Sequence, residues 1–114
     1  NYPGTKAFQC WREIVEDPDI DIIGICTPSH EHLDKFNASI RAGKHVLCEK
    51  PLARNLEDSK EMCRIADNSL LKVGVGFQMR FHPVVQKIDE LLPEIGRIFH
   101  TDFVFGMYRP EITW

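Results

Sequence analysis

These 114 residues lack several features that assign function in other proteins. No apolar run approaches the roughly 20 residues that a membrane-spanning helix needs, and the visible N-terminus does not form a signal peptide. The net charge is −3 with both signs interspersed, so there is no basic surface of the kind that binds nucleic acid. The cysteines form no C-x-x-C pair and have no metal-ligand spacing with histidine. We therefore expect no metal site, and partners that are neither membranes nor nucleic acids.

What the chain does contain is typical of a globular protein from a reducing compartment. Hydrophobic and charged residues make up 43% and 27% of the sequence, which excludes general disorder. Cys26 and Cys48 each end an apolar segment, where cysteine usually behaves as a small buried hydrophobe. We expect all four cysteines to be free thiols and the protein to be cytoplasmic.

Helical and strand-like apolar patterns alternate through the first two thirds of the chain. Helical spacing precedes Pro18 and recurs before Gly43 and after Asn55, where these residues are expected to end and to cap their helices. Short apolar runs at 20–26, 45–48 and 73–77 are expected to be buried parallel strands. This order predicts an α/β fold with right-handed crossovers.

The pattern changes after Arg80, which predicts a domain boundary near residues 78–82. Pro83 fits the first turn of a short helix. From Arg97 to Tyr108 the apolar period becomes two, which predicts a long half-buried antiparallel strand. Its phenylalanine stripe is interpreted as core against second-domain helices, with a sheet-to-sheet contact in a homo-oligomer as the alternative.

Glu49-Lys50-Pro51 stands where the strand at 45–48 runs out. In an open parallel sheet, ligands bind in the crevice beyond the carboxyl ends of the strands. A carboxylate there can accept hydrogen bonds from sugar hydroxyls, and an ammonium can bind a substrate oxygen or move its proton. Pro51 lacks an N–H and fixes its own φ, so it stops the strand and aims both side chains. The alternative is an ordinary acidic–basic pair at a strand-to-helix turn.

Thr27-Pro28 ends the preceding strand and leads into a helix N-terminus, which offers free N–H groups and a positive dipole end. Ser29 is a candidate N-cap of that helix by its chemistry. For His32, the alternative to a binding role is a solvated histidine in the first helical turn.

Three ordered segments, Asp21–His32, Ala42–Pro51 and Gly76–Pro83, together resemble one family. This is the Gfo/Idh/MocA family (glucose-fructose oxidoreductase, inositol dehydrogenase and rhizopine catabolism) of NAD(P)-dependent oxidoreductases. The resemblance runs from about Trp11 to the last residue. It implies a Rossmann-type parallel sheet followed by the start of an α+β substrate domain with an antiparallel sheet. It also implies NAD or NADP as cofactor, and a sugar, polyol or sugar nucleotide as substrate.

The resemblance also implies roles for single residues. The Thr27-Pro28 turn would run beside the dinucleotide, with His32 and Glu49 near the nicotinamide ribose. Lys50 would reach the same ribose and the reacting hydroxyl, and is the expected catalytic residue. Arg80 would lie near the nicotinamide, with an interdomain salt bridge as its alternative. The expected cofactor-binding residues are Thr27, Pro28, Ser29, His32, Glu49, Lys50 and Arg80.

One part of the family pattern is missing. No G-x-G-x-x-G occurs, because Gly74-Val75-Gly76 is followed by Phe77-Gln78-Met79. We therefore interpret the chain as the interior of a longer protein. Residues 1–79 would be a partial dinucleotide-binding domain without its glycine-rich first unit, and residues 80–114 would begin the substrate and oligomerisation domain. The 114-residue piece alone is expected to be inactive and to bind NAD(P) weakly or not at all.

Three functions remain open on the sequence. The favoured one is a dehydrogenase that transfers a hydride between a sugar or polyol and a nicotinamide cofactor. A non-catalytic sensor or co-repressor of the same fold, which binds dinucleotide or sugar, is the first alternative. The second is a scaffold or oligomerisation module. The choice between NAD and NADP rests on a residue that these motifs do not include.

Overall fold

The computed structural model describes residues 3–102 and 104. The chain divides into two compact units, Asn1–Gln78 and Met79–Trp114. The division lies next to the predicted boundary, whereas the assignment of the second unit to a substrate domain stays a prediction. Among the described residues, no helix combines the length and the apolar character that a membrane crossing requires.

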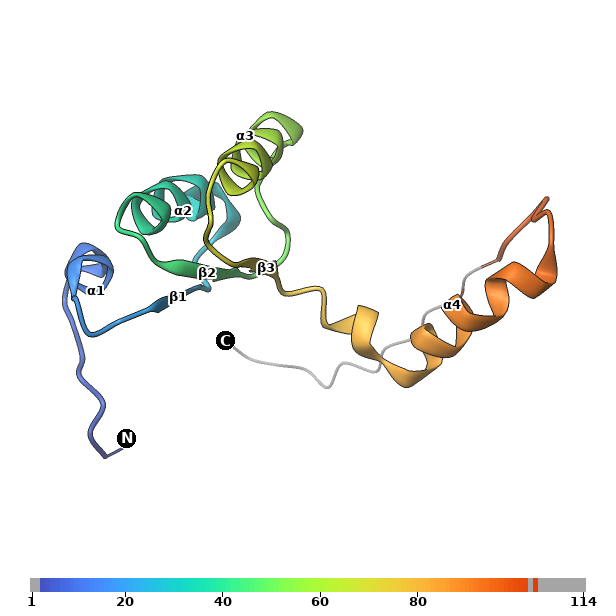
Figure 1. Cartoon of the computed structure of the whole chain (residues 1–114), viewed down its shortest axis with the longest axis horizontal. Coiled ribbons are helices and arrows are strands. Elements are labelled where there is room, and N and C mark those ends of the chain that lie inside the picture. Colours follow the sequence, from blue (N-terminus) through green and yellow to red (C-terminus); the bar gives the residue numbers. More distant parts are fainter. Residues whose placement is uncertain (1–2, 103, 105–114) are drawn as a thin grey trace, which may run out of the picture. The chain divides into compact units, whose positions relative to one another are not determined.

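The first unit contains a three-stranded sheet with helices on one of its faces (Figure 1). The strands β1 (Ile22–Ile25), β2 (His45–Cys48) and β3 (Val73–Val75) follow one another in the order β1-β2-β3. Both neighbouring pairs are parallel. The prediction of three adjacent parallel strands is therefore confirmed, although β1 and β3 end before residues 26 and 77. Their expected burial is wrong for one face, because residues of β1 and β2 such as Ile22 and Leu47 are exposed on the side that the helices do not cover.

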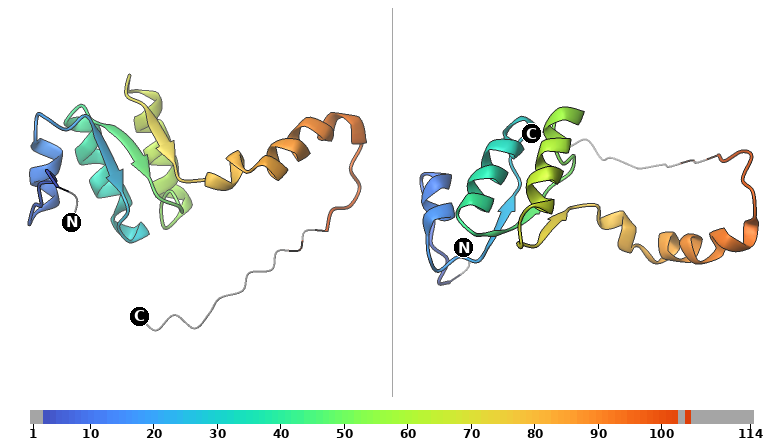
Figure 2. Two further views of the ribbon diagram at one scale, coloured as in Figure 1. Left: turned by 90° about the horizontal axis from the view of Figure 1, so that it is seen from below. Right: turned by 45° about the horizontal axis from the view of Figure 1, so that its top comes forward.

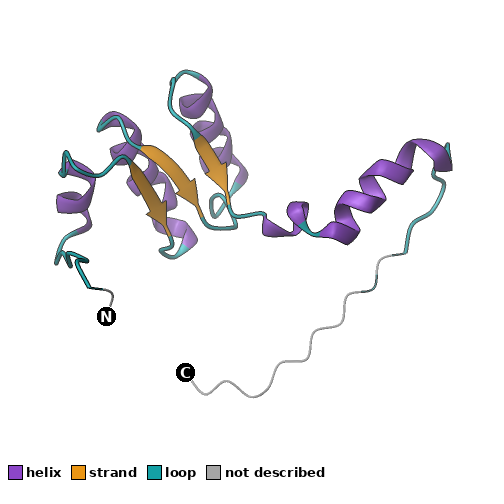
Figure 3. Cartoon of the chain, turned by 60° about the horizontal axis from the view of Figure 1, so that its bottom comes forward, coloured by secondary structure: helices purple, strands orange, loops and turns teal. Residues whose placement is uncertain are grey.

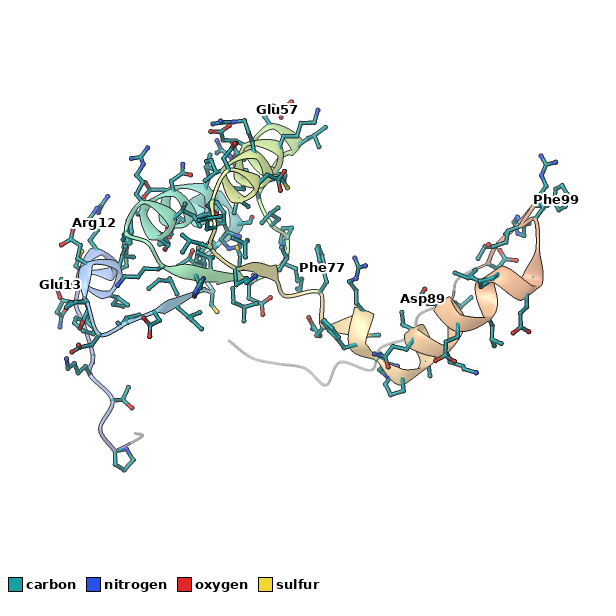
Figure 4. The ribbon with its side chains drawn as sticks, in the orientation of Figure 1. Arg12, Glu13, Glu57, Phe77, Asp89 and Phe99 are labelled. Carbon is teal, nitrogen blue, oxygen red and sulfur yellow. The ribbon has the colours of Figure 1, made fainter. Side chains whose placement is uncertain are left out.

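Three helices accompany this sheet: α1 (Trp11–Glu16), α2 (His32–Arg41) and α3 (Leu56–Asp67). The views in Figure 2 and Figure 3 agree that α2 and α3 cover the same face of the strands, as right-handed crossovers between parallel neighbours require. The shorter α1 packs beside α2. Figure 4 shows Glu57 on the outer side of α3, away from the strands.

Local chemistry sets the start of α3 and the turn after α2 as predicted. The Asn55 side chain caps α3, since its Oδ1 accepts a 2.7 Å hydrogen bond from the backbone N–H of Asp58. The acidic Glu57 and Asp58 lie in the first turn, where they favour the helix dipole. Beyond α2, Gly43 adopts a φ of 75°, which an L side chain rarely tolerates and which turns the chain toward β2.

The core lies between the sheet and the helices. Phe36 of α2 is fully buried, and Met62 of α3 is 1% exposed. They pack with residues that alternate along the strands, such as Ile25 and Val46. Burying one such large side chain contributes roughly 1.5–3 kcal/mol. This core holds β1, β2 and β3 in register, and therefore also positions the segments that follow them.

The second unit contains α4 (Pro83–Ile95), which begins at the predicted proline. His82 caps it, because its Nδ1 accepts a 3.2 Å hydrogen bond from the backbone N–H of Val84. The strand predicted from Arg97 to Tyr108 is absent at residues 97–102 and 104, which have no regular secondary structure. Residues 103 and 105–108 lie outside the described residues. A strand is stabilised by pairing with other strands, and the described part of this unit contains none.

Candidate functional site

The three strands end along one edge of the sheet, and backbone hydrogen bonds extend their pairing beyond the strands. The N–H of Glu49 donates to the carbonyl of Ile25 at 2.9 Å, and the N–H of Gly76 donates to the carbonyl of Cys48 at 2.8 Å. The segments after β1, β2 and β3 are thus held side by side. Figure 4 shows Phe77 in the segment that follows β3. This edge is where ligands bind in open parallel sheets.

Glu49 and Lys50 both lie exposed beyond the end of β2. The Glu49 carboxylate turns back on the chain, where its Oε2 accepts a 3.0 Å hydrogen bond from the backbone N–H of Lys50. The Lys50–Pro51 peptide bond is cis. Within residues 3–102 and 104, no carboxylate forms an ion pair with the Lys50 ammonium. Both charged groups are therefore free to face a ligand, and their role in binding stays a prediction.

His32 is buried, with 1% of the residue exposed, so the alternative of a solvated histidine is wrong. Its Nε2 lies 2.7 Å from the carbonyl oxygen of Thr27, and its Nδ1 lies 3.1 Å from that of Leu52. The ring therefore joins the turn after β1 to the loop that follows Glu49-Lys50-Pro51. A direct contact between His32 and a cofactor stays a prediction.

The thiol of Cys48 completes this buried cluster. Its Sγ lies 3.3 Å from Nδ1 of His32 and 3.9 Å from the carbonyl oxygen of Leu52. A neutral imidazole donates through one nitrogen only, whereas an imidazolium donates to both carbonyls. If the ring is neutral and Nδ1 carries no proton, the Cys48 S–H can donate a weak hydrogen bond to Nδ1.

Burial, with smaller contributions from the neighbouring Cys26 and Glu49, raises the pKa of the Cys48 thiol from 9.0 to about 11. The thiol therefore stays protonated at neutral pH. A pKa raised by folding contributes stability that is complete below about 9 and is lost as the pH rises toward about 11.

Folded protein treated with iodoacetamide near pH 8 is expected to be alkylated at Cys26 and Cys63, which are exposed, and not at Cys48. The reason is that the thiolate is the reacting form, and Cys48 is both buried and protonated. Peptide mass spectrometry measures each site, with urea-unfolded protein as the control in which every cysteine reacts. Alkylation of Cys48 as fast as that of Cys63 would contradict the buried cluster.

Ser29 is not the N-cap of α2, so that prediction is wrong. The helix begins at His32 with Glu31 in the cap position, and no side chain caps it. Pro28 instead leads into a short 3₁₀ turn, η1 (Ser29–Glu31), in which the Glu31 N–H donates to the Pro28 carbonyl at 2.9 Å. This turn separates Ser29 from the helix and leaves its hydroxyl away from the cap.

Thr27 contributes a buried group without a partner. Its Oγ1 is inaccessible and has no hydrogen-bond partner among the described residues. A buried hydroxyl is usually hydrogen-bonded, so we expect this oxygen to have a partner outside the described residues. Thr27 lies at the same edge of the sheet as Glu49 and Lys50, as predicted from strand order.

Arg80 belongs to a different unit of the chain from Thr27, Glu49 and Lys50. It is exposed in a 3₁₀ turn, η2 (Gln78–Phe81), and belongs to the second unit. Its place near a nicotinamide stays a prediction.

Sequence reasoning did not single out Gly76, which follows β3 directly. A Cβ at this position would lie 3.3 Å from Cδ and Oε2 of Glu49. A glycine at a strand end can mark a close approach by another group, and that signal was available in the sequence.

The family assignment follows from a comparison of this chain with known proteins. Residues 1–77 match the model of the Gfo/Idh/MocA oxidoreductase family, described as an NAD-binding Rossmann fold. The chain belongs to this family. The resemblance found in the three sequence motifs is therefore confirmed, and so is the Rossmann-type α/β fold.

Relatives that are named for an activity are similar to this chain over most of its length. Levoglucosan dehydrogenase from Pseudarthrobacter phenanthrenivorans is 42% identical over 90 residues, which are 77% of this chain and 23% of that protein. The 1,5-anhydro-D-fructose reductase of Ensifer adhaerens is 37% identical over 107 residues, 92% of this chain and 32% of that protein. A structure of levoglucosan dehydrogenase with NADH and levoglucosan matches with a TM-score of 0.73 at 40% identity, over 79% of this chain and 25% of that one. The chain thus spans about a quarter to a third of the length of these relatives.

Proposed function

We propose that the whole protein is an oxidoreductase that transfers a hydride between a nicotinamide cofactor, NAD or NADP, and a sugar, polyol or sugar nucleotide. The observation that carries this proposal is the exposed Lys50 ammonium, without an ion pair among the described residues, beside the folded-back Glu49 carboxylate. Both groups stand at the carboxyl edge of a parallel sheet in a chain of an NAD-binding family. Relatives named as dehydrogenases of levoglucosan and of myo-inositol support the substrate class.

The residues at this edge fit the ribose of a dinucleotide and a substrate hydroxyl. The carboxylate of Glu49 can accept hydrogen bonds from ribose hydroxyls, and Thr27 would contribute from the turn that follows β1 at the same edge of the sheet. When bound, the cofactor would supply the hydride acceptor for the substrate carbon. Ser29 and Pro28 would line the same turn, and Arg80 would lie near the nicotinamide.

Lys50 can bind or accept the proton that leaves the substrate hydroxyl. Oxidation of an alcohol to a carbonyl removes a hydride from carbon and a proton from oxygen. Lys50 would bind the substrate oxygen as an ammonium, or take its proton as a neutral amine. His32 would act on this site through the carbonyls of Thr27 and Leu52 that it contacts.

Two further features belong to this proposal. A homo-oligomer formed through the second-domain sheet is expected, as is a cytoplasmic location. The four cysteines are free thiols in the structure, which supports a reducing compartment.

The test is a pair of measurements on the whole protein. NADH and NADPH binding is followed by nicotinamide fluorescence, and turnover is followed with levoglucosan, myo-inositol, 1,5-anhydro-D-fructose and a sugar nucleotide. We expect binding of one cofactor and reduction or oxidation of at least one of these compounds. Cofactor binding without turnover would favour the sensor. The absence of both cofactor binding and turnover would contradict an oxidoreductase.

A further inference from the structure

We propose that Gly76 is a positioning residue, whose missing side chain leaves the space in which the Glu49 carboxylate rests at the end of β3. The inference deepens the proposed function and rests on it, since it assigns a second residue to the orientation of the group expected to bind the ribose. Gly76 itself would touch neither cofactor nor substrate.

Gly76 and the Glu49 carboxylate are in close contact. A Cβ built at Gly76 would lie 3.3 Å from Cδ, 3.3 Å from Oε2 and 3.4 Å from Oε1 of Glu49. All three atoms of the carboxylate therefore pack over the Cα of this glycine. Any side chain would push the carboxylate away by a few tenths of an ångström or more.

The backbones on both sides of this contact are fixed by hydrogen bonds. The Glu49 backbone is held by its N–H bond to Ile25, and the Gly76 backbone by its N–H bond to Cys48. The carboxylate is held again by the N–H of Lys50 at 3.0 Å. A larger residue at position 76 is therefore expected to displace the Glu49 carboxylate from its position over β3.

A positive φ, the usual reason for a glycine, does not apply at Gly76. Among the described residues, the glycines with positive φ are Gly4, Gly43 and Gly96, so the backbone at Gly76 is one that other residues adopt. The close approach of the carboxylate is then the constraint that remains. Gly74, within β3, offers a matched comparison, because a Cβ there would lie 3.3 Å from Cδ1 of Leu47, the end of an exposed apolar side chain.

The experiment is a double-mutant cycle in the whole protein with Gly76→Ala, Glu49→Ala and the double variant, and Gly74→Ala as the control. Displacing a hydrogen-bonded carboxylate is expected to raise the NADH Kd by about 10-fold to 100-fold in Gly76→Ala. In the Glu49→Ala background, Gly76→Ala is expected to change the Kd no further, because the group it displaces is gone. Gly74→Ala is expected to bind NADH as the wild type does.

The melting temperature gives a second readout that does not depend on the cofactor. Replacing glycine by alanine at a compatible backbone stabilises a protein by restricting its unfolded chain. Gly76→Ala is therefore expected to raise the Tm in the Glu49→Ala background and to raise it less, or to lower it, in the wild type. This difference is expected even if the wild type fails to bind NADH, a result that would overturn the proposed function and not the contact.

Two outcomes would overturn the positioning role. One is a Kd effect of Gly76→Ala that is equal in both backgrounds, since it would then act through something other than Glu49. The other is a Gly76→Ala variant as neutral as Gly74→Ala in both Kd and Tm. If Gly76→Ala fails to fold, recovery of folding in the double variant supports the contact, and its absence refutes it.

Discussion

Replacing Lys50 with alanine in the whole protein is expected to lower kcat by about 10²–10⁴-fold and to change the NADH Kd little. The lysine stands at the end of β2, and no carboxylate among the described residues neutralises its ammonium. A group placed to manage the proton of the reacting hydroxyl contributes mainly to the transition state, so its loss lowers kcat and kcat/KM together. Loss of a ground-state contact alone would raise KM with kcat unchanged. Steady-state kinetics with the active substrate, and fluorescence titration with NADH, separate the two cases.

Two companion variants sharpen this result. Lys50→Arg keeps the positive charge, yet it cannot accept a proton at accessible pH and carries a planar head, so a proton-transfer role predicts a low kcat here too. Lys60→Ala removes an exposed lysine of α3 that is not part of the proposed site, and is expected to leave kcat unchanged. A wild-type kcat in Lys50→Ala would remove this residue from the mechanism and favour the sensor.

The parts of the fold that the sequence predicted correctly are those set by nearby residues. Asn55 caps α3 through an N–H three residues away, and Gly43 ends the α2 turn by its own φ. The parallel strands also followed from local patterns, because alternating helices and short apolar runs leave few other topologies. The edge that gathers Glu49 and Thr27 could then be inferred from strand order.

The errors arose where distant or competing interactions decide. Ser29 has the chemistry of an N-cap, but Pro28 starts a 3₁₀ turn that displaces it. The first-turn position of His32 leaves a solvated ring open as an alternative, and only its contact with the carbonyl of Leu52, 20 residues away, and its burial decide against it. Gly76 gained its significance from a side chain 27 positions earlier. Local periodicity contains no information on such contacts.

Replacing the buried His32 with phenylalanine is expected to have a large effect on stability. In His32→Phe the ring volume is kept while both ring nitrogens are removed, so packing is nearly preserved and the contacts with Thr27 and Leu52 are lost. Leaving a buried carbonyl without its donor costs about 1–3 kcal/mol, for each carbonyl that His32 serves. We expect the free energy of unfolding of the whole protein, measured in urea, to fall by at least this amount.

The same variant is expected to weaken NADH binding, because His32 ties the turn at Thr27 to the loop after Glu49-Lys50-Pro51. His32→Gln keeps one amide donor and is expected to fall between the wild type and His32→Phe in both stability and Kd. The matched control is His30→Phe, two positions earlier, where the histidine is exposed and its ion pair with Glu31 is a surface contact. There the free energy of unfolding is expected to change by less than about 0.5 kcal/mol. Equal effects at positions 30 and 32, or a His32→Phe protein as stable as the wild type, would show that the buried ring does not hold these two segments together.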